Sequence, residues 1–224
     1  MKVLVLWSGG VESTSLLKHL LSTTMDDVYA HHISMINPEN RAGEEFDAVF
    51  ALLPELRKIR KFTFDMSTIS ISGGKALPFD FEIQYPIAVA AAKLHGCERI
   101  YRAGCAEDDW NHKWKDGVLI TENPKADEPG FSHRRRAKTL DFFGVKGTEI
   151  APWLQFYAHP KAWHWNYLGE LAPMTWSCRT PIDGNECGKC HTCLEKDAAM
   201  KGTSAIPEVA AAIELQQAKK PVQA

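Results

Sequence analysis

Four cysteines near the carboxyl end of the sequence have the spacing of a metal-binding knuckle. Eight residues separate the first from the second, and two residues separate each later pair: Cys178, Cys187, Cys190 and Cys193. Four thiolates match the tetrahedral preference of zinc, and four protein ligands leave no position open for a substrate. The spacing therefore predicts a structural zinc site. An iron–sulfur cluster uses the same ligand type and is the alternative, whereas disulfides are less expected.

A second group of residues has the composition of a phosphate-binding turn. Ser8-Gly9-Gly10-Val11-Glu12-Ser13-Thr14 follows a short apolar run and precedes a helical pattern. Two glycines let the backbone approach an anion, while the helix amino terminus and three hydroxyl groups supply hydrogen-bond donors. The segment lacks both the Gly-Lys ending of the mononucleotide P-loop and the third glycine of the dinucleotide fingerprint. We predict a pyrophosphate site here; the alternative is a plain tight turn.

The elements that must position these residues alternate between strand and helix patterns. Strands are predicted at 2–7, 28–34, 59–64, 98–103 and 149–154, and helices at 11–21, 44–56, 82–95, 132–143, 161–171 and 205–217. This alternation favours an α/β fold with a Rossmann-like, doubly wound parallel sheet, whose ligands bind beyond the carboxyl ends of the strands. Residues 110–130, rich in charge, Gly and Pro, are predicted to form a mobile loop over that edge.

Length and charge limit the classes of function. The 224 residues, 45% of them hydrophobic, suffice for a nucleotide-binding α/β domain at 1–172 and a zinc-binding segment with a helix at 173–224. A formal net charge of -2 disfavours a nucleic-acid partner. The sequence lacks a long apolar run and a secretion signal, so we expect a cytoplasmic protein that does not bind membranes.

The two motifs together resemble a known family. The turn at residue 8 is similar to the Ser-Gly-Gly-x-Asp-Ser turn of the PP-loop ATP pyrophosphatases. Combined with the segments Trp176-Ser-Cys178-Arg-Thr and Glu186-Cys-Gly-Lys-Cys-His-Thr-Cys193, it resembles the 7-cyano-7-deazaguanine synthase (QueC) family. The resemblance implies a Rossmann-like sheet, structural zinc, and ATP with magnesium. It also implies adenylation of 7-carboxy-7-deazaguanine, attack by ammonia to give an amide or nitrile, and a homodimer.

The same resemblance implies further site residues. Lys161 and Arg41 are candidates for ATP phosphate contacts, and the loop that contains Gly104, Glu107 and Asp109 is a candidate for substrate binding. From the residue types alone, an exposed lysine and a solvated acidic loop explain these positions nearly as well.

Two departures from the family pattern indicate a divergent branch. Glu12 replaces the aspartate of the turn, and Pro78-Phe79-Asp80-Phe81-Glu82 stands where the family has an arginine-containing segment. The acceptor amine is therefore open: ammonia, or an amine on a protein, as in QueC-like proteins of antiphage defence systems. A PP-loop enzyme that thiolates tRNA and a non-catalytic nucleotide binder are the remaining alternatives.

Overall fold

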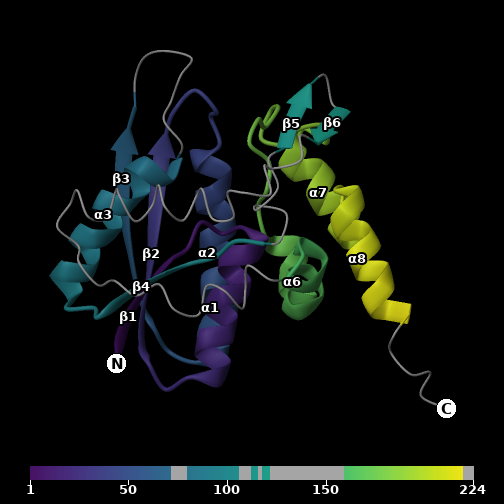
Figure 1. The fold of residues 1–224 in the computed structure, drawn as a ribbon. Coiled ribbons are helices and arrows are strands. Elements are labelled where there is room, and N and C mark those ends of the chain that lie inside the picture. Colours follow the sequence, from purple (N-terminus) through teal and green to yellow (C-terminus); the bar gives the residue numbers. More distant parts are fainter. Residues whose placement is uncertain (72–79, 106–111, 116–117, 122–158, 219–224) are drawn as a thin grey trace, which may run out of the picture.

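The computed structural model describes residues 1–71, 80–105, 112–115, 118–121 and 159–218. Its largest element is a four-stranded sheet (Figure 1). The strands are β1 (Lys2–Leu6), β2 (Asp27–Ile36), β3 (Thr63–Ser70) and β4 (Arg99–Arg102). All are parallel, and they lie in the order β3-β2-β1-β4.

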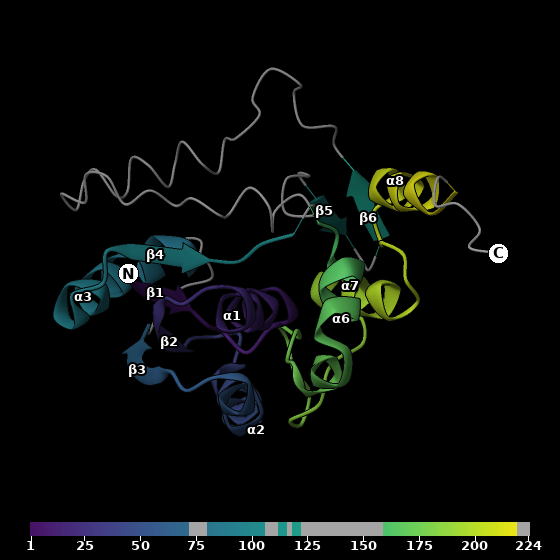
Figure 2. The same ribbon diagram turned by 90° about the horizontal axis from the view of Figure 1, so that it is seen from below.

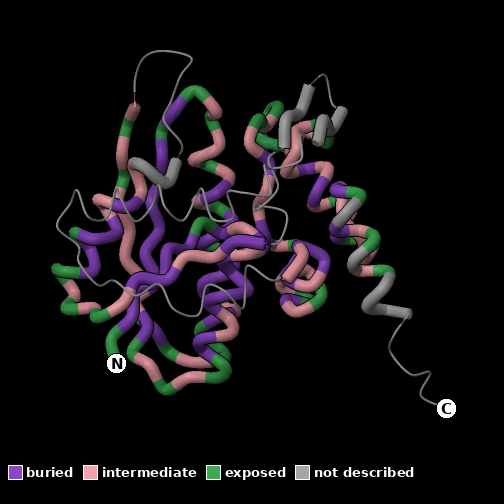
Figure 3. Tube along the Cα trace, viewed as in Figure 1, coloured by how far each residue is buried: buried purple, intermediate pink, exposed green. Residues whose placement is uncertain are grey.

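Strand β1, one of the two inner strands, is buried from its second residue onward (Figure 3). Successive side chains of a strand point to opposite faces of the sheet. Val3 and Val5 accordingly join one apolar cluster, and Leu4 and Leu6 join the other. The unbroken apolar run of β1 is what a parallel strand covered on both sides requires.

Helices cover both faces of this sheet. Helices α1 (Val11–Thr23) and α2 (Ala42–Ile59) pack on one face, where Leu17 is fully buried (Figure 2). Helix α3 (Asp80–His95) packs on the other face, where Ala88 is fully buried. The predicted α/β class is therefore confirmed, with a parallel sheet compatible with a Rossmann-like fold.

The boundary between α2 and β3 differs from the prediction of a strand at 59–64. Ile59 is the last residue of α2, and β3 begins four residues later at Thr63. Arg57 and Lys58 lie in the last helical turn, where positive side chains are favourable beside the carboxyl end of the helix dipole. The Arg60 guanidinium then donates hydrogen bonds to carbonyl oxygens at the end of α1 and beyond it, which fixes this turn.

Helix α6 (Lys161–Leu168) joins the carboxyl-terminal part of the chain to α1. The Ser15 hydroxyl donates to the His164 carbonyl at 3.2 Å, and Lys18 Nζ donates to the Tyr167 carbonyl at 2.7 Å. The helix predicted at 161–171 ends earlier, because Gly169 adopts a φ of 61°. The chain continues as the 3-10 helix η2 (Gly169–Met174).

The remaining helices follow the cysteines. Helix α7 (His191–Met200) begins directly after Cys190, within the four-cysteine segment, and was not predicted. Helix α8 (Pro207–Ala218) confirms the helix predicted at 205–217. Figure 1 shows α6 beside α1 and α7 beside α6. No helix among the described residues is both long and apolar enough to cross a membrane.

The segment 110–130 contains structure that the prediction of a mobile loop missed. Strands β5 (His112–Lys115) and β6 (Val118–Thr121) form an antiparallel pair. The helix predicted at 132–143 and the strand predicted at 149–154 lie outside the described residues.

Candidate functional site

The glycine turn lies between the carboxyl end of β1 and the start of α1, as predicted. Its hydroxyl groups are joined: Ser8 Oγ and Ser13 Oγ are 3.1 Å apart, and Ser13 Oγ donates to the Gly10 carbonyl at 3.2 Å. The Ser8 amide donates to Ser13 Oγ at 3.2 Å. These bonds close the turn around Gly10, which directly precedes the first residue of α1.

Gly9 is required for both the conformation and the packing of the turn. Its φ of 79° lies in the left-handed region, which L side chains rarely adopt. A Cβ atom at Gly9 would lie 3.0 Å from Val49 Cγ2 and 3.3 Å from the Glu45 carbonyl oxygen. The turn is thus pressed against α2, and its backbone path depends on a missing side chain.

Val11 and Thr14 face the core and not the edge of the sheet. Both are fully buried. Thr14 Oγ1 accepts a hydrogen bond from Trp7 Nε1 at 3.1 Å. Their side chains therefore anchor α1 in the core. The predicted contacts of Val11 and Thr14 with a phosphate would involve their backbone amides and not their side chains.

Glu12, in the first turn of α1, forms a partly buried ion pair with Lys161. Glu12 Oε1 lies 3.0 Å from Lys161 Nζ, and Lys161 is only 4% exposed. Glu195 Oε2 of α7 lies 2.7 Å from the same Nζ and is also buried. The sequence alternative of an exposed lysine is therefore wrong, and Lys161 joins the glycine turn, α6 and α7.

The charges of this cluster reinforce one another. Burial by itself would lower the pKa of Lys161, but the Glu12 and Glu195 carboxylates reverse this and hold the pKa well above its usual value. Burial would raise the pKa of Glu12, but Lys161 and His164 lower it below its usual value. Both partners are therefore charged at neutral pH.

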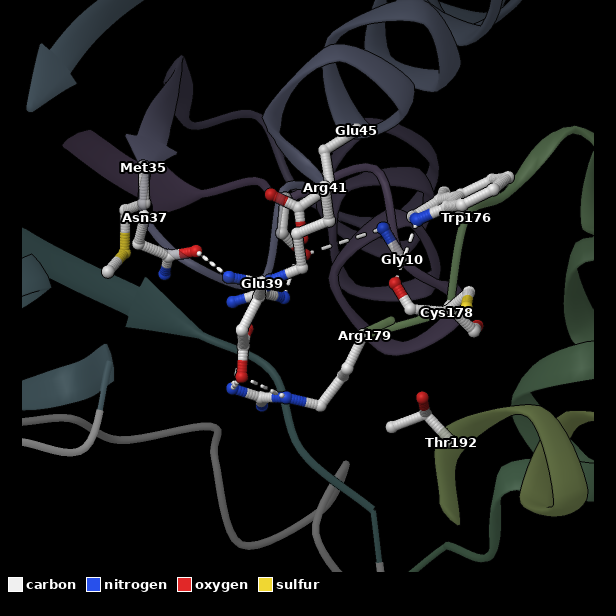
Figure 4. A network of polar contacts seen from close by, with 12 residues as sticks. Gly10, Met35, Asn37, Glu39, Arg41, Glu45, Trp176, Cys178, Arg179 and Thr192 are labelled. Atoms are coloured by element: carbon white, nitrogen blue, oxygen red, sulfur yellow. Dashed lines mark hydrogen bonds and ion pairs between the residues drawn. The ribbon is translucent and has the colours of Figure 1, made fainter. Parts of the chain in front are cut away.

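A second polar cluster lies beyond the carboxyl end of β2 (Figure 4). Arg41 Nε lies 2.7 Å from Glu39 Oε2, and Arg41 Nη1 lies 2.7 Å from Glu45 Oε1. Arg179 Nη2 lies 2.8 Å from the other oxygen of Glu39. Glu39 therefore holds two guanidinium groups, one from the start of α2 and one from the residue after Cys178.

The cysteine segment (residues 176–195) also contacts the glycine turn (residues 8–14) directly. The Trp176 amide donates to the Gly9 carbonyl at 3.1 Å. Trp176 Nε1 donates to the Cys178 carbonyl at 2.9 Å. Figure 4 shows Gly10, Trp176 and Cys178 close together.

The four cysteines have the geometry of a tetrahedral metal site. Their Sγ atoms all lie within 4.8 Å of one another: Cys178, Cys187, Cys190 and Cys193. The Sγ atoms of Cys187 and Cys193, and those of Cys190 and Cys178, are 4.0 Å apart. Ligands about 2.3 Å from a zinc ion span tetrahedral edges of about 3.8 Å. The cluster can therefore hold a metal ion such as zinc.

Two of these sulfur atoms accept hydrogen bonds from backbone amides within the cluster. The Cys187 and Cys190 amides donate to Sγ of Cys178 and of Cys187, each at 3.3 Å. Burial raises the pKa of the Cys187 thiol, but hydrogen bonds from the Thr180 hydroxyl and from the Lys189 and Cys190 amides lower it to about 6. These hydrogen bonds thus favour the thiolate form of Cys187.

The predicted substrate loop is described only at its start. Gly104 is buried beyond the end of β4, and the neighbouring Cys105 is 1% exposed. Cys105 lies close enough to Lys161 for its charge to raise the pKa of that lysine. Glu107 and Asp109 lie outside the described residues.

Sequence reasoning missed three charged residues of this region: Glu39, Arg179 and Glu195. Arg179 and Glu195 are the first and second residues after a cysteine ligand, and this proximity was an available signal. Comparison with protein-family models finds no match for this chain, and comparison with curated proteins finds none either.

Proposed function

We propose that this protein is an ATP-dependent enzyme that adenylates the carboxylate of 7-carboxy-7-deazaguanine and passes the acyl group to an amine. The observation that carries the proposal is the convergence of the glycine turn, Lys161 and the cysteine segment beyond the carboxyl end of β1. Open α/β sheets bind their ligands at this edge, and a glycine turn at a helix amino terminus favours phosphate. We accordingly propose a PP-loop fold.

The chemistry requires a leaving group on an unreactive acid. A substrate carboxylate oxygen attacks the α-phosphorus of ATP, the bond to the β-phosphate oxygen breaks, and pyrophosphate leaves. The amine then attacks the acyl carbon, AMP leaves, and the amine loses a proton. With ammonia the product is an amide, and a second activation by ATP would give the nitrile.

The residues of the turn would stabilise the departing pyrophosphate. Its donors are the backbone amides at Gly9 and Gly10 and the hydroxyls of Ser8 and Ser13, and the Ser13 hydroxyl would exchange its bond to the Gly10 carbonyl for one to a phosphate oxygen. Lys161 and Arg41 carry the positive charge, and each of them faces two carboxylates. Magnesium that arrives with ATP would offset phosphate charge at an edge where carboxylates are this abundant.

The cysteine cluster would hold a structural zinc ion in this proposal. Four thiolates fill a tetrahedral shell, so the ion has no open position for a substrate. Its role would be to fix the segment that carries Trp176 and Arg179 against the glycine turn.

The test is a product assay with purified protein. The protein is incubated with ATP, 7-carboxy-7-deazaguanine and ammonium, and pyrophosphate, AMP and the deazaguanine product are measured by mass spectrometry. Release of pyrophosphate that depends on the acid supports the proposal. Lys161→Met should abolish it, while Lys58→Met, whose side chain is 70% exposed in α2, should not.

The products also identify the amine. An amide or nitrile points to ammonia, and a conjugate formed only when a protein is added points to a protein amine. Absence of pyrophosphate under all these conditions would contradict the proposed enzyme and leave a nucleotide binder.

A further inference from the structure

Three residues of the cysteine segment, each within two positions of a cysteine ligand, contact the region of the glycine turn in the described part of the chain. The Trp176 amide reaches the Gly9 carbonyl, Arg179 reaches Glu39, and Glu195 reaches Lys161. The third contact continues to the turn itself, because Lys161 also binds Glu12. It is also the most buried: the Lys161 and Glu195 side chains are 6% and 8% exposed.

A metal ion held by the cysteines would constrain where Glu195 lies. Cys190 is the residue that directly precedes α7, and Cys193 lies in the first turn of this helix. A tetrahedral ion that holds both sulfur atoms therefore fixes the start of α7. Glu195 follows Cys193 by two residues, so its carboxylate is placed by the same constraint.

We infer that Glu195 is a positioning residue through which the metal-bound cysteine segment sets the orientation of Lys161 and Glu12 at the nucleotide site. This inference rests on the proposed function for its ligand, a nucleoside triphosphate. The Lys161 ammonium has three hydrogens, and two of them are directed by carboxylates on different elements. The carboxylate of Glu195 thereby restricts the ammonium to one place beside the turn.

The direction of the effect separates positioning from simple electrostatics. Glu195 is negative, so its removal would strengthen binding of an anion if only its charge mattered. If it positions Lys161, its removal weakens nucleotide binding, because the ammonium loses its fixed place. A glutamine keeps the acceptor oxygen without the charge, and a methionine of similar length keeps neither.

The experiment compares Glu195→Met, Glu195→Gln and Asp197→Met. Asp197 lies on the same helix in an ion pair with Lys201, and its side chain is 59% exposed, so it controls for loss of a negative charge from α7. Three quantities are measured on the full chain: zinc content, hydrogen exchange of peptides covering residues 8–14, and calorimetric affinity for a non-hydrolysable ATP analogue.

We expect all three variants to retain the zinc content of the unaltered protein. Glu195→Met should speed hydrogen exchange at residues 8–14. It should also lower the affinity for the ATP analogue about tenfold, which is the effect of one charge-assisted hydrogen bond. Glu195→Gln should recover part of both losses, and Asp197→Met should change neither. Removal of zinc should weaken binding of the ATP analogue more in the unaltered protein than in Glu195→Met.

Each contrary result is informative. Unchanged exchange and unchanged or tighter nucleotide binding in Glu195→Met would overturn the inference, as would loss of zinc in that variant, since its effect would then act through the metal site. If the unaltered protein binds no nucleotide, the proposed function fails. The exchange data would still show whether Glu195 orders the turn.

Discussion

Lys161 Nζ lies 3.0 Å from the Glu12 carboxylate, although the two residues are far apart in the sequence. The pair places α6 against the first turn of α1, next to the glycine turn. A buried ammonium is costly unless carboxylates accompany it, so Lys161 can be buried here only because Glu12 and Glu195 lie beside it. The Lys161 side chain is therefore expected to contribute both to the stability of the fold and to the proposed activity.

Replacement of Lys161 by methionine should destabilise the protein by about 3–5 kcal/mol, because it leaves the buried Glu195 carboxylate and the partly buried Glu12 carboxylate without a cation. The measurement is the urea unfolding midpoint at neutral pH. Lys58→Met removes an exposed ion pair with Glu55 and should cost less than about 1 kcal/mol. Equal effects of the two substitutions would show that the buried cluster has no special role.

The conformation of the turn gives a second prediction. Gly9→Ala should destabilise the fold by about 1–3 kcal/mol, because alanine is strained at a φ of 79° and its Cβ would crowd Val49. Gly43→Ala is the matched control, because Gly43 lies in α2 with nothing within 4 Å of the added atom. That change should stabilise the protein by about 0.4–1 kcal/mol. Thermal unfolding of both variants measures the contrast, and a neutral Gly9→Ala would contradict it.

Local sequence patterns were sufficient for strands β1, β2 and β4 and for the cysteine cluster. The apolar run of β1 and the spacing of the four cysteines are short-range features that physical chemistry links to one structure. The helix α7 was missed because the cysteines and glycines around Cys190 were interpreted only as a metal-binding knuckle, whereas the chain becomes helical directly after Cys190.

Contacts between distant elements could not be read from the sequence. Nothing near Lys161 indicates that it lies against Glu12, and Glu195 has the pattern of a solvent-facing helix residue. The β5–β6 pair was predictable, since Asp116-Gly117 separates its strands and Asp-Gly is a strong hairpin signal. The prediction of a mobile loop at 110–130 followed instead from the high charge and glycine content of the surrounding segment.

Metal removal gives a third prediction. Cys187→Ser should reduce bound zinc to a small fraction of the one ion per chain expected of the unaltered protein, because three ligands no longer close the tetrahedron. Helix α7 begins among these ligands, so chelation should also lower the helical signal in circular dichroism. Cys97→Ser is the control, since Cys97 packs beside α3 and lies outside the cluster. Equal zinc content in both variants would contradict the assignment of the ligands.

The buried histidine His32 makes stability depend on pH in a defined direction. It is fully buried, and its Nδ1 lies 3.0 Å from the Trp7 carbonyl, which can only accept, so Nδ1 carries the proton. Nε2 has no hydrogen-bond partner in the described structure, so a proton there would be buried without an acceptor. Burial therefore lowers the pKa of His32 below its usual value of 6.5.

Because the folded pKa is the lower one, the unfolded chain takes up a proton below pH 6.5 before the folded protein does. The stability contributed by neutral His32 is thus complete above pH 6.5 and declines as the pH falls, by at most about 1.4 kcal/mol per pH unit. His32→Asn keeps a donor for Trp7 and removes the titrating ring. The difference in unfolding free energy between the two proteins, measured from pH 7.5 to 5.5, cancels the other ionisable groups, including the cysteine ligands. It should shift in favour of the variant as the pH falls, and a difference that does not vary with pH would show that His32 is protonated equally in both states.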